Sequence, residues 1–188
     1  MSAGVVLAFS FVVPVAADSL EDAVAAYRRA DYPAAMRLYR PFAEQGLAVA
    51  QFNLGLMYDM GQGVSQNYPE AVKWYRLAAD QGRADAQYQL GHLYYKQKDY
   101  AEAAKWFQLA ADQGRADAQS SLGAMYAKGE GVPQDFVLAL MWFSLAAAQS
   151  HKDAIENRDK AVQLMTPGQI AEAQKLARNW KPTSRPPN

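Results

Sequence analysis

The chain has 188 residues, no cysteine, and 19 acidic side chains against 19 basic ones, so its formal net charge is zero. This balance argues against nucleic acid or an anionic membrane as the partner, because both attract strongly basic proteins. The lack of cysteine excludes disulfides, thiolate catalysis and cysteine metal sites. Since only two histidines remain as further ligands, we expect neither a metal nor a cofactor.

The first residues differ from everything that follows. An uncharged, mostly apolar run covers residues 5–13, no charged side chain occurs before Asp18, and Val15 and Ala17 suit a cleavage site. We therefore expect residues 1–17 to be a secretory signal peptide, although no lysine or arginine precedes the run. The mature protein would then be periplasmic or secreted, with no stable insertion in a membrane. An uncleaved N-terminus that anchors the chain is the alternative.

The segment after the predicted cleavage site reads as a single helix. Ser19 followed by Asp22 has the spacing of a capping box, in which each residue bonds the backbone of the other. Residues 18–31 are therefore predicted to form an N-terminal capping helix for the rest of the chain.

From residue 32 onward the sequence repeats itself. Residues 71–87 return almost unchanged as 103–119, and more loosely as 35–51 and 139–155. These segments start 36, 32 and 36 residues apart, a period that is typical of solenoids built from helical hairpins. The period predicts four units: residues 32–67, 68–99, 100–135 and 136–165.

Each unit is predicted to contain two antiparallel helices. In the first helix, small and aromatic residues recur three, four and eight positions after a leading alanine, which places them on one helix face. A glycine ends this helix in three units, and a Leu-Gly pair and a tyrosine mark the second helix. In the second unit these positions are Ala71, Trp74, Tyr75, Ala79, Gly82, Leu90, Gly91 and Tyr94.

The pattern weakens toward the C-terminus. Ser150 replaces the glycine of the other units, as expected for a terminal repeat. Thr166 and Pro167 then begin a last helix, so residues 166–180 are predicted to form a C-terminal capping helix that covers the last hairpin. Its apolar stripe consists of Ile170, Ala173, Leu176, Ala177 and Trp180. Residues 181–188, with three prolines, are predicted to be a disordered tail.

The repeated motif resembles the Sel1-like repeat (SLR), a relative of the tetratricopeptide repeat. The pattern is Trp-Tyr-x-x-Ala-Ala-x-Gln-Gly-x-Ala-x-Ala-Gln-x-x-Leu-Gly-x-x-Tyr, with Gly-x-Gly-Val after two of the tyrosines, and it covers residues 32–143 closely. The resemblance implies an all-α, right-handed α-solenoid of antiparallel helix pairs, with about nine or ten helices after the signal peptide. It also implies a non-enzymatic scaffold or adaptor, with periplasmic regulators of sensor kinases among the relatives.

A basic stripe is the best candidate for a partner-binding site. Positions two and five residues after the leading alanine share a helix face and align between stacked units. If the first helices line the concave side, as in tetratricopeptide proteins, they form a groove for an acidic or extended peptide. The alternative is an ordinary solvated helix surface. The predicted residues are Arg37, Arg40, Lys73, Arg76 and Lys105, and the stripe becomes neutral at Met141 and Ser144.

No catalytic residue is predicted. His92 and His151 are isolated in the sequence, and the loop that contains Gly61 and Gly63 lacks the Lys-Ser/Thr pair of a phosphate-binding loop. Two other functions stay open. Cysteine-rich SLR relatives have been linked to β-lactam binding or hydrolysis, which suggests a cell-wall-active hydrolase, and a secreted effector is the other. The leading interpretation is a monomeric, exported protein that binds a protein or peptide.

Overall fold

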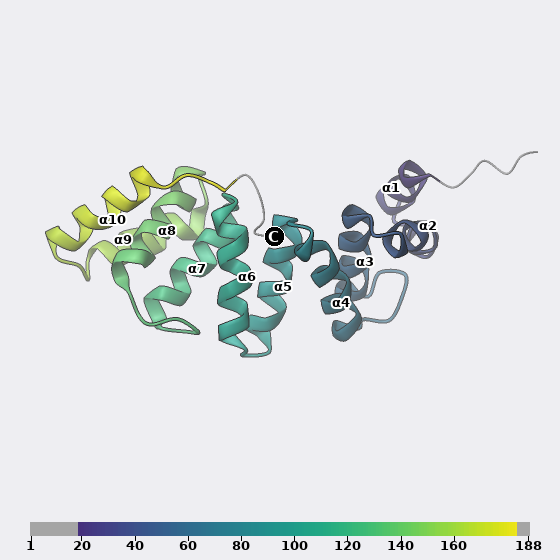
Figure 1. The fold of residues 1–188 in the computed structure, drawn as a ribbon, viewed down its shortest axis with the longest axis horizontal. Helices are drawn as coiled ribbons and strands as arrows, with labels where there is room; N and C mark the ends of the chain where they lie inside the picture. Colours follow the sequence, from purple (N-terminus) through teal and green to yellow (C-terminus); the bar gives the residue numbers. More distant parts are fainter. Residues whose placement is uncertain (1–18, 184–188) are drawn as a thin grey trace, which may run out of the picture.

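The structure is a computed structural model that describes residues 19–183 (Figure 1). This part of the chain contains ten helices and no strand, arranged as consecutive pairs, which confirms the predicted all-α solenoid. The predicted signal peptide and residues 184–188 of the predicted tail lie outside the described residues. The helices are α1 (Leu20–Arg28), α2 (Tyr32–Glu44), α3 (Ala48–Met60), α4 (Tyr68–Asp80), α5 (Ala84–Lys96), α6 (Tyr100–Asp112), α7 (Ala116–Lys128), α8 (Phe136–Ala148), α9 (Lys152–Val162) and α10 (Pro167–Asn179).

The first helices of the units, α2, α4, α6 and α8, begin and end in the same way. The side chain before each helix accepts a hydrogen bond from the backbone three residues further on, as with Asn67 and Glu70 at 3.1 Å. Gly46, Gly82 and Gly114 follow the first three helices with φ between 88° and 92°, a conformation that other residues avoid. The fourth unit places Ser150 there with φ of 64°. These shared ends keep the four helices in one register.

Neighbouring units meet where an aromatic ring packs on a glycine. The second helix of one unit packs on the first helix of the next, so that α3 contacts α4, α5 contacts α6, and α7 contacts α8. A Cβ atom at Gly55 would come within 2.5 Å of the Tyr75 ring. Only glycine therefore allows the two helices to approach this closely. The equivalent pairs are Gly91 with Phe107 and Gly123 with Phe143.

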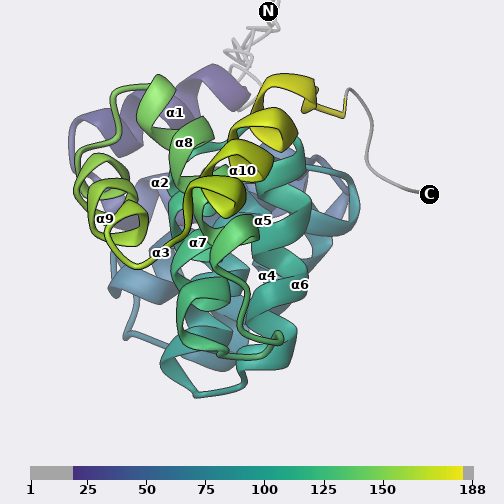
Figure 2. The ribbon, with the colours of Figure 1, turned by 90° about the vertical axis from the view of Figure 1, so that its left-hand side faces the viewer.

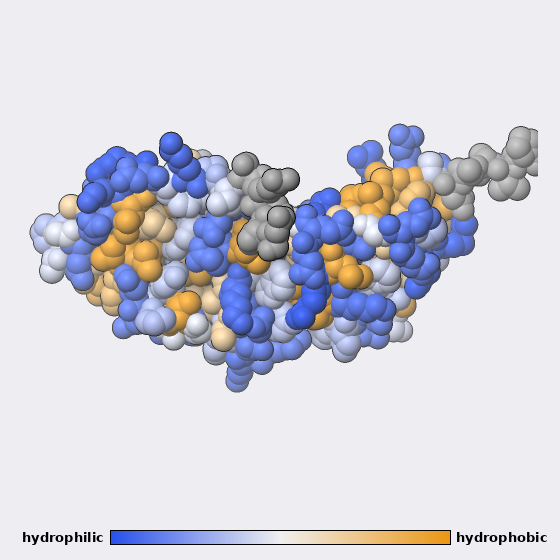
Figure 3. All heavy atoms as spheres, viewed as in Figure 1, coloured by the Kyte–Doolittle hydropathy of each residue, from blue (hydrophilic) through white to orange (hydrophobic). Residues whose placement is uncertain are grey.

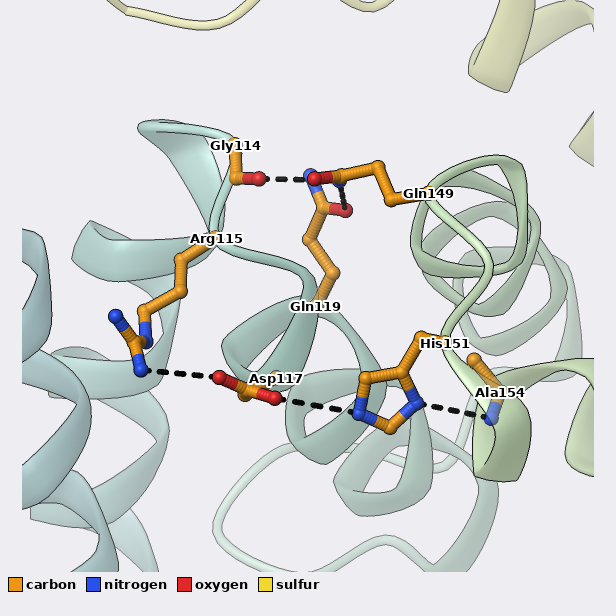
Figure 4. Close-up of polar contacts among 7 residues, drawn as sticks. All are labelled: Gly114, Arg115, Asp117, Gln119, Gln149, His151 and Ala154. Carbon is orange, nitrogen blue, oxygen red and sulfur yellow. Dashed lines mark hydrogen bonds and ion pairs between the residues drawn. The ribbon is translucent and has the colours of Figure 1, made fainter.

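Glutamine side chains connect the turns of successive units. The Gln81 side-chain amide donates to the Gln51 amide oxygen at 2.7 Å. Gln149 repeats this contact with Gln119 at 3.0 Å and also donates to the Gly114 carbonyl at 3.0 Å (Figure 4). Gln51 and Gln119 are buried, so these bonds satisfy polar groups that would otherwise be costly inside the protein.

The links between units alternate in length, and each long link contacts the helix that precedes its own unit. The Tyr27 hydroxyl donates to the Gln62 side-chain oxygen at 2.8 Å. Sixty-eight positions later, the Tyr95 hydroxyl donates to a Glu130 carboxylate oxygen at 2.7 Å. The short links are residues 29–31 and 97–99, and the long ones are 61–67 and 129–135. The chain therefore repeats over two units as well as over one.

The last helix does not extend the stack. α10 packs mainly along α8 (Figures 1 and 2), and its Ala173 is fully buried there. The chain then runs toward the end of α6, where the Thr183 backbone N–H donates to the Asp112 carbonyl at 2.7 Å. α10 thus covers the first helix of the last hairpin in particular.

Candidate functional site

The five predicted binding residues lie on the first helices of three consecutive units. Because these helices share their register, the residues align from unit to unit. Arg37, Lys73 and Lys105 occupy the sixth position of α2, α4 and α6, and Arg40 and Arg76 occupy the ninth position of α2 and α4. We call the outward surface of α2, α4, α6 and α8 the first-helix face.

Two of the arginines are held by tyrosines of the paired second helix. Arg40 Nη2 donates to the Tyr58 hydroxyl at 3.2 Å. Arg76 Nη2 donates to the Tyr94 hydroxyl, and its guanidinium carbon lies 5.9 Å from the centre of that ring. The tyrosines limit the motion of both guanidinium groups, which keep further N–H donors for a carboxylate. Two successive units therefore each present a guanidinium group that a tyrosine holds in place.

The two lysines are exposed and lie beside glutamates. Lys73 Nζ lies 3.5 Å from a Glu70 oxygen, and Lys105 contacts Glu102 in the same way. The lysine side chains are 58% and 68% exposed. Exposed pairs one turn apart stabilise a helix by less than about 0.5 kcal/mol, so an anionic partner can replace the glutamates at little cost. The surface is a mixed row of charges and is less positive than the stripe alone suggested.

The pattern changes in the third unit. Gln108 takes the place of the arginine and donates to Asp112 Oδ1 at 2.8 Å. Burial raises the pKa of Asp112, and the hydrogen bond from Gln108 partly offsets that effect. The same end of α6 receives Thr183, so here the first-helix face begins to contact the C-terminal segment.

In the fourth unit the first-helix face is apolar and covered. Met141 stands at the position of Lys73 and Lys105, and Leu138 at that of the two glutamates. Met141 is only 7% exposed because Leu176 and Ala177 of α10 belong to the same cluster. The signal for this cover in the sequence is the contrast between Leu138 and Met141 and the charged residues at the same positions of α4 and α6. The neutral end of the stripe is thus the contact surface of α10.

Three of the four tryptophans lie just beneath this face, and the fourth packs against one of them. Trp74, Trp106 and Trp142 occupy the seventh position of α4, α6 and α8. Trp180, just after α10, meets Trp142 edge to face, with ring centroids 6.2 Å apart. The indole N–H groups of Trp74 and Trp106 are buried and have no acceptor among the described residues. Tryptophan fluorescence therefore reports on this face.

Both histidines make contacts within the helix stack. His92 stacks on Tyr88 with ring centroids 6.4 Å apart, and burial lowers the pKa of His92. His151 Nδ1 accepts from the Ala154 backbone N–H at 3.3 Å and so caps α9, while its Nε2 lies 3.4 Å from Asp117 (Figure 4). Across residues 19–183, no group of three or more histidine and carboxylate side chains is placed to hold a metal ion. No helix in this range is long and apolar enough to cross a bilayer.

Comparison with solved structures finds similar helical repeat proteins, whereas no curated protein matches significantly. A Sel1 repeat protein from Oxalobacter formigenes is 38% identical, with a TM-score of 0.60 over 65% of this chain and 95% of its own. MamA is 22% identical, with a TM-score of 0.56 over 83% of this chain and 90% of its own, a likeness of fold alone. A protective antigen of uropathogenic Escherichia coli strains with an SLR fold is 28% identical, with a TM-score of 0.47, over 84% of this chain and 45% of its own.

The family comparison agrees with the repeats seen in the sequence and in the structure. The Sel1 repeat model matches residues 25–47, 48–82, 84–114 and 116–151, which together make up more than half of the chain. From the second match onward, each segment joins a second helix to the following first helix, so it spans the glycine and aromatic contact between units. The chain therefore belongs to the Sel1 repeat family.

Proposed function

We propose that this chain is a non-enzymatic scaffold that binds a protein partner on its first-helix face. Sel1 repeat proteins are typically scaffolds for protein-protein interaction. The observation that carries the choice of face is α10, a helix of the chain itself that already packs on this face at α8. The open part of the face offers Arg37, Arg40, Lys73, Arg76 and Lys105 to an acidic peptide or domain.

The proposed binding needs little rearrangement of the scaffold. The helices are fixed by packing between units, and the guanidinium groups of Arg40 and Arg76 are already held by tyrosines. A preformed surface loses less entropy on binding than one that must be ordered. The exposed charges mainly guide the partner and set its orientation, so we expect affinity to fall as salt rises.

The test compares two triple charge reversals in cells. A photocrosslinking residue replaces Lys105, a largely exposed position on the first-helix face. In this background, Arg40→Glu, Lys73→Glu and Arg76→Glu are combined, and the control combines Lys152→Glu, Arg158→Glu and Lys160→Glu on α9. We expect the crosslinked partner to be lost with the first combination and kept with the second. A partner captured equally by both variants would contradict the basic site.

We further propose that the mature chain acts outside the cytoplasm. The support is the apolar run of residues 5–13 followed by the small residues Val15 and Ala17. Cell fractionation with N-terminal sequencing tests this location, and we expect a soluble periplasmic or secreted chain that begins at Asp18. A chain that keeps Met1 and stays with the membrane would contradict it.

A further inference from the structure

The apolar part of the first-helix face is covered by a helix that is weakly held. Ala173 is the buried residue of α10, whereas six residues of α8 are buried. Ile170, Leu176 and Ala177 of α10 are only partly buried. Segments with few buried apolar contacts open at lower free energy than the core around them. α10 is therefore the helix that leaves the stack most easily.

The connections at both ends of α10 allow it to leave. Residues 163–166 link it to α9, and Leu164 in this link is 71% exposed. Beyond α10, the Thr183 backbone and hydroxyl both donate to one acceptor, the Asp112 carbonyl. α8 itself stays fixed when α10 leaves, because α7 and α9 pack against it as well. Detachment thus exposes a site without dismantling the solenoid.

The surface beneath α10 has a chemistry of its own. Leu138, Met141, Trp142 and Leu145 of α8 form it, with no charged side chain at the positions that carry lysine and glutamate in α4 and α6. Figure 3 shows the outside of this end of the molecule, where apolar and hydrophilic areas lie side by side. The apolar surface of α8 suits one apolar face of an amphipathic helix.

We propose that α10 is exchangeable and that α8 is a binding site for an amphipathic helix of a partner protein. The contacts of α10 define the helix that fits. It has a small residue at the position of Ala173, which is fully buried, and aliphatic and aromatic residues at the positions of Leu176 and Trp180. The site uses none of the arginines and lysines of the proposed function, so either proposal can fail without the other.

The test uses the full chain with its own α10 disabled. Ala173 is 0% exposed, so Ala173→Glu prevents α10 from packing on α8. The probe is a fluorescein-labelled peptide of residues 166–183, and binding is followed by fluorescence anisotropy. We expect the A173E variant to bind the peptide at least ten-fold more tightly than the wild type, where the tethered α10 competes at a local concentration of roughly millimolar.

Two control variants make the result specific. Gln174→Glu adds the same charge to an exposed position of α10 and should behave like the wild type. Met141→Lys combined with A173E should abolish peptide binding, because it puts a charge into the apolar site. The proposal is overturned if the A173E variant keeps its helical circular dichroism and cooperative melting but does not bind the peptide, or if M141K leaves binding unchanged.

Hydrogen exchange on the wild type gives an independent measurement. We expect the amides of α10 to exchange at least about 100-fold faster than those of α8, because α10 opens locally. Equal protection of the amides of α8 and α10 would overturn the proposal that α10 detaches from α8. Sedimentation of the wild type then tests whether the helix that binds α8 comes from a second copy of this chain. A wild-type dimer that M141K abolishes would mean that α10 of a second copy packs on α8. That result would overturn the assignment of the site to a partner protein.

Discussion

The first-helix face is built differently at α4 and at α8, although the two helices belong to the same repeat. At the sixth position, Lys73 is 58% exposed beside Glu70, whereas Met141 is 7% exposed under α10. At the seventh position both helices carry a buried tryptophan. The positions that hold the units together are kept, and the positions beside them decide what the surface contacts.

This difference shows which constraints act on each position. The ring of Phe107 on Gly91 and that of Phe143 on Gly123 join units in both halves, so the same residue types recur. Lys73 and Met141 make no such contact between units. The residue type at these positions therefore depends on what contacts the face, which is solvent at α4 and α10 at α8.

The strongest test of this comparison exchanges the residue types, lysine and methionine, at the sixth position of the first helices. Met141→Lys should lower the free energy of unfolding by about 2–4 kcal/mol, because the lysine either loses water beneath α10 or displaces α10. Urea unfolding followed by circular dichroism measures the loss.

The matched control is the opposite exchange in the third unit. Lys105→Met lies on the exposed surface of α6, and we expect a change within about 0.5 kcal/mol. If both variants lost the same free energy of unfolding, the sixth positions of α6 and α8 would not differ in burial, and the comparison would fail.

A smaller effect is expected from the aromatic contact that ends the covered region. Trp180→Ala removes the ring that meets Trp142 and should lower the free energy of unfolding by about 1–2 kcal/mol. Loss of a fully buried tryptophan costs about 3–5 kcal/mol, and the smaller value is expected because Trp180 is partly exposed. The fluorescence of Trp142 should also shift to longer wavelength as water reaches it. Trp180→Phe keeps an aromatic ring in this place and should lose less than half as much. An alanine variant as stable as the wild type would show that α10 does not depend on this contact.

The fold was predictable from the sequence because packing repeats. Gly91 and Phe107 recur in register with Gly123 and Phe143, and this recurrence alone indicates stacked hairpins. The candidate site was predictable only in part. The spacing of Arg40 and Arg76 placed them on one face, but nothing local indicates that Tyr58 and Tyr94 hold them, because those partners lie 18 residues away.

The position of α10 was harder to predict for the same reason. Its apolar stripe indicated that it covers the last hairpin, yet the stripe does not specify α8 or α9 as the partner. The choice follows from Leu138 and Met141, which are apolar where the other units are charged. A single helix read alone does not show this, and only comparison with the equivalent positions of α4 and α6 does.

The smallest predicted loss or gain outside the control variants concerns the turn that distinguishes the fourth unit from the other three. Ser150 has φ of 64° where Gly114 has φ of 89°. Ser150→Gly should therefore raise the free energy of unfolding by about 0.5–1 kcal/mol, because glycine adopts this conformation without strain. Gly114→Ser should lower it by a similar amount, since an added Cβ would lie 3.7 Å from the Trp180 ring, an ordinary contact, and only the backbone would be strained. Thermal and urea unfolding of both variants measure the pair. If neither changed stability, the serine would be as well suited to this turn as glycine, and the fourth unit would differ from the others only in what covers it.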